Sequence, residues 1–225
     1  ENVEYGISVW GDDANLKGNT ASHNDGWGIS VSGAGASLLA NDSIGNSGNG
    51  FEIRNGDAKV LKNKAIHNGS AGFAVRNAQV KFSRNVAVGN LQEGVTWSDS
   101  SGKVTSNVAA TNGSDGFSVD AAGASFSKNV TDANQGFGID ADGNSLELKA
   151  NWARANGNGG VRVRLGATKV EVAKSIAFGN DRVDSNAFDL DDENSGCGSN
   201  SWTSNYLGGK EEPVSGVAAA EACIR

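Results

Sequence analysis

Residues 63–75 read NKAIHNGSAGFAV, and residues 85–97 (NVAVGNLQEGVTW) and 107–119 (NVAATNGSDGFSV) repeat the same arrangement at a constant interval. The asparagines of this unit continue along most of the chain in two series with the same step: Asn2, Asn24, Asn46, Asn68, Asn90, Asn112, Asn134 and Asn156, and Asn19, Asn41, Asn63, Asn85, Asn107, Asn129 and Asn151. A glycine series keeps the same register: Gly6, Gly28, Gly50, Gly72, Gly94, Gly116, Gly138 and Gly160. A fixed period of this length is the signature of a solenoid, in which each unit stacks on its neighbours.

Apolar residues occupy three short runs in each unit. One run follows the glycine, as in Phe73 and Val75, and a second precedes the first asparagine, as in Val80 and Phe82. A third run, between the two asparagines, carries an alanine such as Ala87. Alternation with period two indicates a strand with one buried face. Three short strands and three corners per unit predict an all-β, right-handed parallel β-helix of about eight to nine turns.

The asparagines have a physical role in such a helix. Asparagine tolerates the left-handed backbone conformation that a corner can require. When turns stack about 4.8 Å apart, identical amides also lie over one another and form hydrogen bonds along the stack. A leucine-rich repeat has units of similar length, but the chain lacks the L-x-x-L-x-L pattern of that fold.

The unit N-x-A-x-x-N-x-x-x-G-[FI]-x-V, found from about residue 2 to residue 180, resembles the repeats of the pectate-lyase-like superfamily. Within that superfamily it is most similar to the carbohydrate-binding and sugar-hydrolase branch. The resemblance implies the fold but selects no activity, because the superfamily contains lyases, hydrolases, epimerases and inactive binding proteins.

Composition limits the partners of the protein. A net charge of −7 argues against nucleic acid and anionic membranes, and no apolar run approaches the length of a membrane-spanning helix. Because the sequence enters the repeat in mid-turn, we also expect an upstream cap or domain.

The C-terminal part of the chain differs from the repeats. We divide the chain into a β-helix (1–194) and a C-terminal capping segment (195–225). Cys197 and Cys223 bracket that segment, so we expect a disulfide in a secreted or cell-surface protein, with two buried thiols as the alternative. Three apolar side chains of the segment are expected to cover the open end of the core: Trp202, Tyr206 and Leu207.

Aromatic residues gather in the first two units. Tyr5 and Trp27 occupy the same position of successive units and should stack at one corner, with Trp10 on the outward side of the neighbouring strand. Exposed rings on a rigid surface can bind the apolar faces of sugars. Packing against an upstream cap is the alternative, and the sequence leaves both open.

A basic stripe is expected in the middle units. Lys59, Lys81 and Lys103 occupy one outward position in three successive turns, and a second position carries Lys62, Arg84 and Lys128. Unit charges at this spacing repel by about 1 kcal/mol even in water. The stripe therefore predicts an anionic partner, and lysines that simply fan into solvent are the alternative.

The outward side of the glycine-led strand carries the candidate catalytic residues. Asp120 and Asp142 should stack with Asp140 beside them, and Arg162 and Arg164 follow in the next unit. Three close carboxylates need a cation or a shared proton. In related lyases aspartates hold Ca²⁺ against a uronate, and in related hydrolases they act as general acid and base. Ion pairs on a solvated sheet are the alternative.

Two further groups complete the candidate site. Arg54 and Arg76 occupy the same outward strand position in earlier units and are candidate ligands of substrate carboxylates. Asp189 and Asp191 belong to an acidic, irregular segment, and oxygen-rich segments of this kind can bind Ca²⁺.

The sequence predicts an extracellular β-helix that binds an acidic polysaccharide, and it leaves open whether a lyase or hydrolase activity accompanies binding. The competing hypothesis is a non-catalytic rod, adhesin or surface module. The near-perfect period favours that alternative, because no loop before residue 160 is long enough to close over a substrate.

Overall fold

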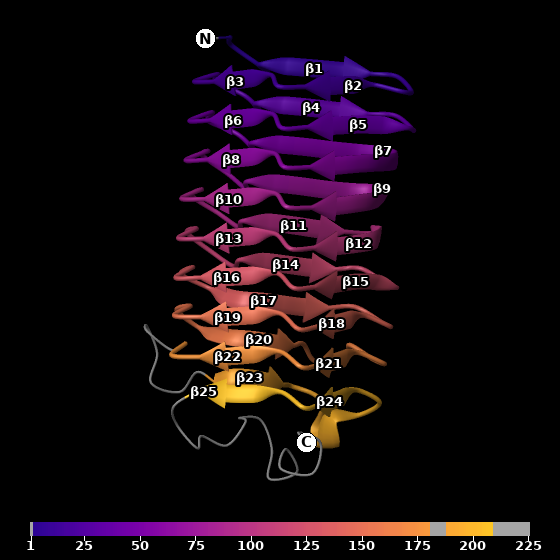
Figure 1. Ribbon diagram of the computed structural model, residues 1–225, viewed down its shortest axis with the longest axis vertical. Helices are drawn as coiled ribbons and strands as arrows, with labels where there is room; N and C mark the ends of the chain where they lie inside the picture. Colours follow the sequence, from indigo (N-terminus) through magenta and orange to yellow (C-terminus); the bar gives the residue numbers. More distant parts are fainter. Residues whose placement is uncertain (1, 181–187, 209–225) are drawn as a thin grey trace.

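The computed structural model describes residues 2–180 and 188–208, which form a parallel β-helix with three faces (Figure 1). The first face follows the glycine of each unit, and its strands are β1 (Ile7–Trp10), β4 (Ile29–Ser32), β7 (Phe51–Leu61), β9 (Phe73–Ser83), β11 (Val95–Ser98), β14 (Phe117–Asp120), β17 (Phe137–Asp142), β20 (Gly159–Val163) and β23 (Phe188–Asp192). Strands β7 and β9 are long enough to continue around the corner onto the second face.

The second face contains the far halves of β7 and β9 together with β2 (Asn15–Lys17), β5 (Ala36–Leu39), β12 (Ser101–Thr105), β15 (Ala124–Ser127), β18 (Glu147–Lys149), β21 (Glu171–Ala173) and β24 (Ser201–Thr203). The third face is a separate sheet of β3 (Thr20–Ser22), β6 (Asp42–Ile44), β8 (Lys64–Ile66), β10 (Val86–Val88), β13 (Val108–Ala110), β16 (Val130–Asp132), β19 (Trp152–Arg154), β22 (Ile176–Phe178) and β25 (Tyr206–Gly208). A short 3₁₀ segment, Ser195–Cys197, precedes β24.

Every strand pairs in parallel with the strand one turn away, and the register confirms the predicted period. Phe51 lies beside Phe73, and Lys59 lies beside Lys81, so equivalent positions of successive units are neighbours. The inward residues form one continuous core along the rod. Its aromatic part includes the stacked rings of Phe51 and Phe73, whose centroids are 4.6 Å apart. In the described residues, no helix is long and apolar enough to cross a membrane.

The asparagine ladders are present as predicted and are buried. The Asn107 side-chain amide donates to Asn129 Oδ1 at 2.9 Å and to the Phe82 carbonyl at 3.2 Å. Asn107 Oδ1 accepts from the backbone N–H and the side-chain amide of Asn85, at 2.8 and 3.2 Å. Each ladder asparagine in the middle of the rod therefore satisfies polar groups in the turns on both sides of it.

At the two corners that carry the asparagine ladders, the left-handed residue is not the ladder asparagine, so that part of the prediction was wrong. Positive φ falls on the residue before the asparagine, for example His23, Lys62, His67, Arg84 and Lys128. The asparagine keeps ordinary φ because its side chain must point inward along the stack, and the preceding residue makes the bend.

The repeated glycine is required for space. A Cβ on Gly72 would lie 2.8 Å from the Asn90 side-chain nitrogen and 2.6 Å from the Gly94 carbonyl oxygen. Both distances are shorter than any tolerated carbon contact, so the glycine series and the asparagine series depend on each other.

The solenoid continues beyond residue 194. β24 pairs with β21 and β25 pairs with β22, so residues 201–208 extend the sheets of the second and third faces. Trp202 is buried in the core, but the predicted covering role of Tyr206 was wrong, because its side chain is exposed. Cys197 is buried, and Cys223 lies outside the described residues, so their pairing stays a prediction.

Candidate functional site

The lysine stripe lies on the second face as predicted. Lys59, Lys81 and Lys103 are in direct register on β7, β9 and β12, and all three are exposed. Among the ion pairs of the described residues, none includes these three lysines. Three stacked ammonium groups without carboxylate partners repel one another, and an anionic ligand would relieve that repulsion.

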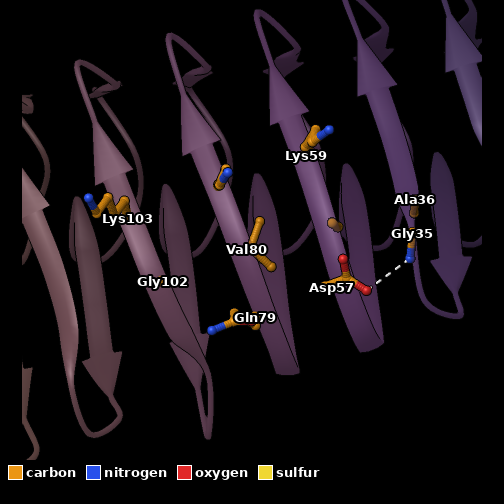
Figure 2. A pocket seen from close by; sticks show the side chains of 10 residues that line it. Gly35, Ala36, Asp57, Lys59, Gln79, Val80, Gly102 and Lys103 are labelled. Carbon is orange, nitrogen blue, oxygen red and sulfur yellow. Dashed lines mark hydrogen bonds between the residues drawn. The ribbon is translucent and has the colours of Figure 1, made fainter.

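A shallow groove of about 420 Å³ runs across these strands beside the lysines. Figure 2 shows Lys59 and Lys103 on one side of it, with Asp57 and Gln79 nearer the other. The Asp57 carboxylate is partly engaged, because its Oδ1 accepts a hydrogen bond from the Gly35 N–H at 3.0 Å. The remaining groove wall is lined by Gly35, Ala36, Ala58, Val80, Lys81 and Gly102.

Around the corner on the first face, Arg54 and Arg76 surround Glu52. The Glu52 side chain is fully buried, although it occupies the same outward strand column as Asp140. Arg54 Nε donates to Glu52 Oε1, Arg76 Nη1 lies 3.4 Å from the same oxygen, and the Asn49 amide donates to Oε2 at 2.6 Å. Glu52 is buried because the two long guanidinium side chains of its own and the next turn cover it. Two guanidinium groups surround a single carboxylate, so this cluster has a net positive charge.

The predicted aromatic residues partly join this cluster. The Arg54 guanidinium lies 4.7 Å from the centre of the Trp27 ring, and the Tyr5 and Trp27 rings are 5.2 Å apart. Trp10 is separated from Arg54 by Ser32 in the intervening turn, and its indole N–H donates to Ser8 at 3.0 Å. Four of the predicted binding residues (Tyr5, Trp27, Arg54 and Arg76) therefore form one surface, and Trp10 lies outside it.

The three predicted catalytic aspartates do not act as one cluster. Asp120 and Asp142 are in register, as expected, but Asp140 is buried at 1% exposure and faces the arginines. Arg162 binds both Asp140 oxygens, with Nε–Oδ1 and Nη2–Oδ2 distances of 2.9 Å, and Arg164 Nε donates to Oδ2 at 2.8 Å. The expectation that Asp140 would be an outward, available carboxylate was wrong, because two guanidinium groups occupy its oxygens.

The charge state of Asp140 follows from these contacts. Burial raises the pKa of its carboxyl, but hydrogen bonds from Arg162 and Arg164 and the charges of both outweigh burial and hold the pKa below its usual value. A general acid needs a raised pKa, so the geometry does not fit Asp140 for that role. The Arg162 guanidinium is also fixed from its other side by the Phe137 ring, at 3.9 Å from the ring centre.

The two aspartates expected to bind calcium in the irregular segment do not form a metal site with other carboxylates of the described residues. Asp189 Oδ1 accepts from the side-chain amide and the backbone N–H of Asn180, at 2.6 and 3.2 Å, so Asp189 ends an asparagine ladder. Asp191 lies in register with Arg162. Across residues 2–180 and 188–208, no group of three or more His, Cys, Asp or Glu side chains is placed to hold a metal ion.

Two carboxyl groups near Asp140 have raised pKa values. Burial raises the pKa of Asp115 to about 6, opposed by a hydrogen bond from the Phe137 N–H and assisted by the charge of Asp140. Burial also raises the pKa of Asp191 to about 6, assisted by the charge of Glu193 and opposed by Arg162. Nothing in the repeat pattern selects Asp115, because its corner position is filled by unrelated residues in other turns.

These shifts predict a pH dependence of stability. A carboxyl whose folded pKa is raised stabilises the fold when protonated, and this contribution disappears as the pH rises from about 4 through about 6. We therefore expect the melting temperature to be higher at pH 5 than at pH 7.5. Thermal unfolding of the Asp115→Asn and Asp191→Asn variants should show a smaller difference between the two pH values. An unchanged difference in both variants would contradict the assignment.

Comparison with models of known protein families matches residues 5–149 to the right-handed β-helix region, which is well over half of the chain. No curated protein matches the sequence. The family match agrees with the parallel register of all three faces. The chain therefore belongs to the right-handed β-helix family.

Proposed function

We propose that this protein binds a linear acidic polysaccharide along the second face of the rod. The observation that supports this is the stack of Lys59, Lys81 and Lys103, three exposed and unpaired ammonium groups in register beside a groove. Neighbouring lysines are about 4.8 Å apart along the rod, so a polyanion that lies along the rod meets a positive charge in each of three successive turns.

The adjacent arginine cluster supports the same proposal. β7 and β9 connect the two faces, so Arg54 and Lys59 lie on one strand and Arg76 and Lys81 on the next. Arg76 makes only the long 3.4 Å contact with Glu52 and is half-exposed, so most of its donors are available. A planar guanidinium can bind a carboxylate with two parallel hydrogen bonds. The basic surface thus covers adjacent turns of a protein whose net charge is −7.

We propose binding without cleavage. Asp140, which the sequence placed at the centre of the candidate catalytic group, is buried and ion-paired with Arg162 and Arg164, and its pKa is lowered. Incubation with uronic-acid polysaccharides should release neither unsaturated, ultraviolet-absorbing ends nor reducing ends. Turnover that is lost in Asp142→Ala would instead support a lyase or hydrolase of the pectate-lyase-like branch.

A polysaccharide ligand implies a location outside the cell or on its surface. The predicted pairing of Cys197 with Cys223 belongs to the same proposal, because disulfides persist in oxidising compartments. Mass spectrometry of a non-reduced digest should recover the two cysteine peptides as one species. Recovery of two separate thiol peptides would reject the pairing.

Replacement of the three lysines tests the proposed ligand. In Lys59→Gln/Lys81→Gln/Lys103→Gln, we expect the affinity for an oligogalacturonide to fall by about 10- to 100-fold, because each exposed ion pair contributes about 0.5–1 kcal/mol. Isothermal titration at low salt measures the difference. Folding should be unchanged, since the side chains extend into solvent.

A matched control uses basic residues at a corner. Lys62→Gln/Arg84→Gln/Lys128→Gln removes the same charge from positions that lie next to the second face but outside the groove. An equal loss of affinity in both triple variants would mean that the net charge of the protein, and not the groove, determines binding. No binding of any acidic glycan by the unmodified protein would favour the structural-rod alternative.

A further inference from the structure

The outward side of the third face becomes aromatic toward its C-terminal end. Strand register stacks Val130, Trp152, Ile176 and Tyr206 in one outward column. A second column, two residues further along the same strands, contains Asp132, Arg154 and Phe178. The middle residue of β16, β19 and β22 points into the core, so both columns face away from it. This surface shares no residue with the basic groove.

Two of the aromatic rings in these columns are strongly exposed to solvent. Trp152 is 44% exposed and Tyr206 is 63% exposed. The Trp152 and Phe178 ring centres are 6.1 Å apart, with an angle of 50° between the planes, so Phe178 supports the indole from one side. β19 is paired on both sides, which fixes the backbone beneath the rings. Exposed large apolar side chains gathered on a rigid sheet indicate an interaction surface.

A polar pair lies beside the indole. Arg154 Nη2 is 2.7 Å from Asp132 Oδ2, and both side chains remain partly exposed, at 48% and 29%. The two charges cancel, so this surface offers no net charge to an anion. Several donors of Arg154 and the other oxygen of Asp132 stay available for hydrogen bonds with hydroxyl groups.

The size of the surface selects a narrow ligand. Its strands are three residues long, which is about 10 Å, and the distance from Val130 to Tyr206 covers about 15 Å. An area of this order is far below the roughly 800 Å² per partner that a stable protein interface needs. A sugar ring matches better, because its C–H face packs on an aromatic ring while its hydroxyls reach a polar neighbour.

We infer that Trp152 and Tyr206, together with the Asp132–Arg154 pair, form a binding site for the uncharged pyranose rings of a linear glycan. Trp152 and Tyr206 are two turns apart, about 10 Å along the rod, so each would contact a different sugar ring of the same glycan chain. The site lies on a different face from the lysine groove and takes a ligand of different charge. It therefore does not depend on the proposed binding of acidic polysaccharide.

Titration with neutral oligosaccharides tests the inference. We expect the protein to bind at least one of the cello-, xylo- and manno-oligosaccharides, with a dissociation constant on the order of 1 mM or tighter. Trp152→Leu keeps an apolar strand residue but removes the ring, and Tyr206→Leu does the same for the second ring. Each should weaken binding by about 10-fold or more. Thermal unfolding of each variant, unchanged from the parent, shows that the loss is local.

Two controls make the result specific. Trp10→Leu removes a tryptophan that is 76% exposed on the first face, and it should leave neutral-sugar binding unchanged. The triple lysine variant should also bind neutral oligosaccharides normally. The inference is overturned if no neutral oligosaccharide binds, or if Trp10→Leu costs as much as Trp152→Leu. It is also overturned if Trp152→Leu abolishes self-association in light scattering and leaves sugar binding intact.

Discussion

Asn107→Ala is expected to lower the free energy of unfolding by about 3–5 kcal/mol, a large fraction of the stability of a typical domain. The Asn107 side chain is buried at 1% exposure and takes part in four hydrogen bonds, two as donor and two as acceptor. Alanine removes all four and leaves the Asn85 N–H and the Phe82 carbonyl unsatisfied inside the rod. Each buried unsatisfied group costs about 1–3 kcal/mol. Urea unfolding followed by circular dichroism measures the loss.

Asn19→Ala is the matched control within the same ladder. Asn19 is the first member of its series, is only partly buried, and donates one side-chain hydrogen bond, to Asn41 Oδ1 at 3.0 Å. That oxygen keeps a second donor, the Asn19 backbone N–H at 2.9 Å. We expect a loss of about 1 kcal/mol. Equal losses of unfolding free energy in the two variants would mean that the conformational preference of asparagine for a corner, and not its ladder hydrogen bonds, explains why it is repeated.

Asp140→Ala is expected to destabilise the protein by about 3 kcal/mol. Removing one partner of a buried ion pair leaves the other charge uncompensated, which costs about 3–5 kcal/mol in fully buried cases. The cost here falls at the lower end because Arg164 is 42% exposed and can turn toward solvent. Arg162, at 21% exposure and held against Phe137, is less free to do so. Thermal and urea unfolding of the variant measure the effect.

Asp142→Ala provides the comparison for Asp140. Asp142 lies two residues further along β17 and is 49% exposed, and its closest ion-pair contact is 4.0 Å, to Arg164. Exposed pairs of this kind contribute about 0–1 kcal/mol. A larger loss in Asp142→Ala than in Asp140→Ala would contradict the account of the Asp140 ion pairs.

The sequence predicted the parts of this structure that depend on the period alone. A strictly constant repeat length places Lys59, Lys81 and Lys103 in one column whatever the corners do, and the structure has them in register. The same reasoning placed Asp120 beside Asp142. Registers of this kind follow from repetition and need no knowledge of side-chain conformation.

The remaining features depend on side-chain choices that repetition does not determine. Glu52 and Asp140 occupy an outward position, yet both are buried because long arginine side chains of the same and next turns cover them. Asp189 was assigned to a calcium site because it belongs to an acidic, irregular segment, but it accepts the ladder hydrogen bonds of Asn180. The left-handed corner residue was misplaced by one position, since the asparagine needs its side chain inside the rod.

Lysine footprinting with bound ligand tests the central claim most directly. The protein is treated with an amine-acetylating reagent with and without a saturating oligogalacturonide, and modification of each lysine is quantified by mass spectrometry. If the glycan lies along the second face, Lys59, Lys81 and Lys103 should be protected together, and the exposed corner residues Lys62 and Lys128 should react as in the free protein. Uniform protection of all five lysines, or protection confined to the corner pair, would contradict binding in the groove.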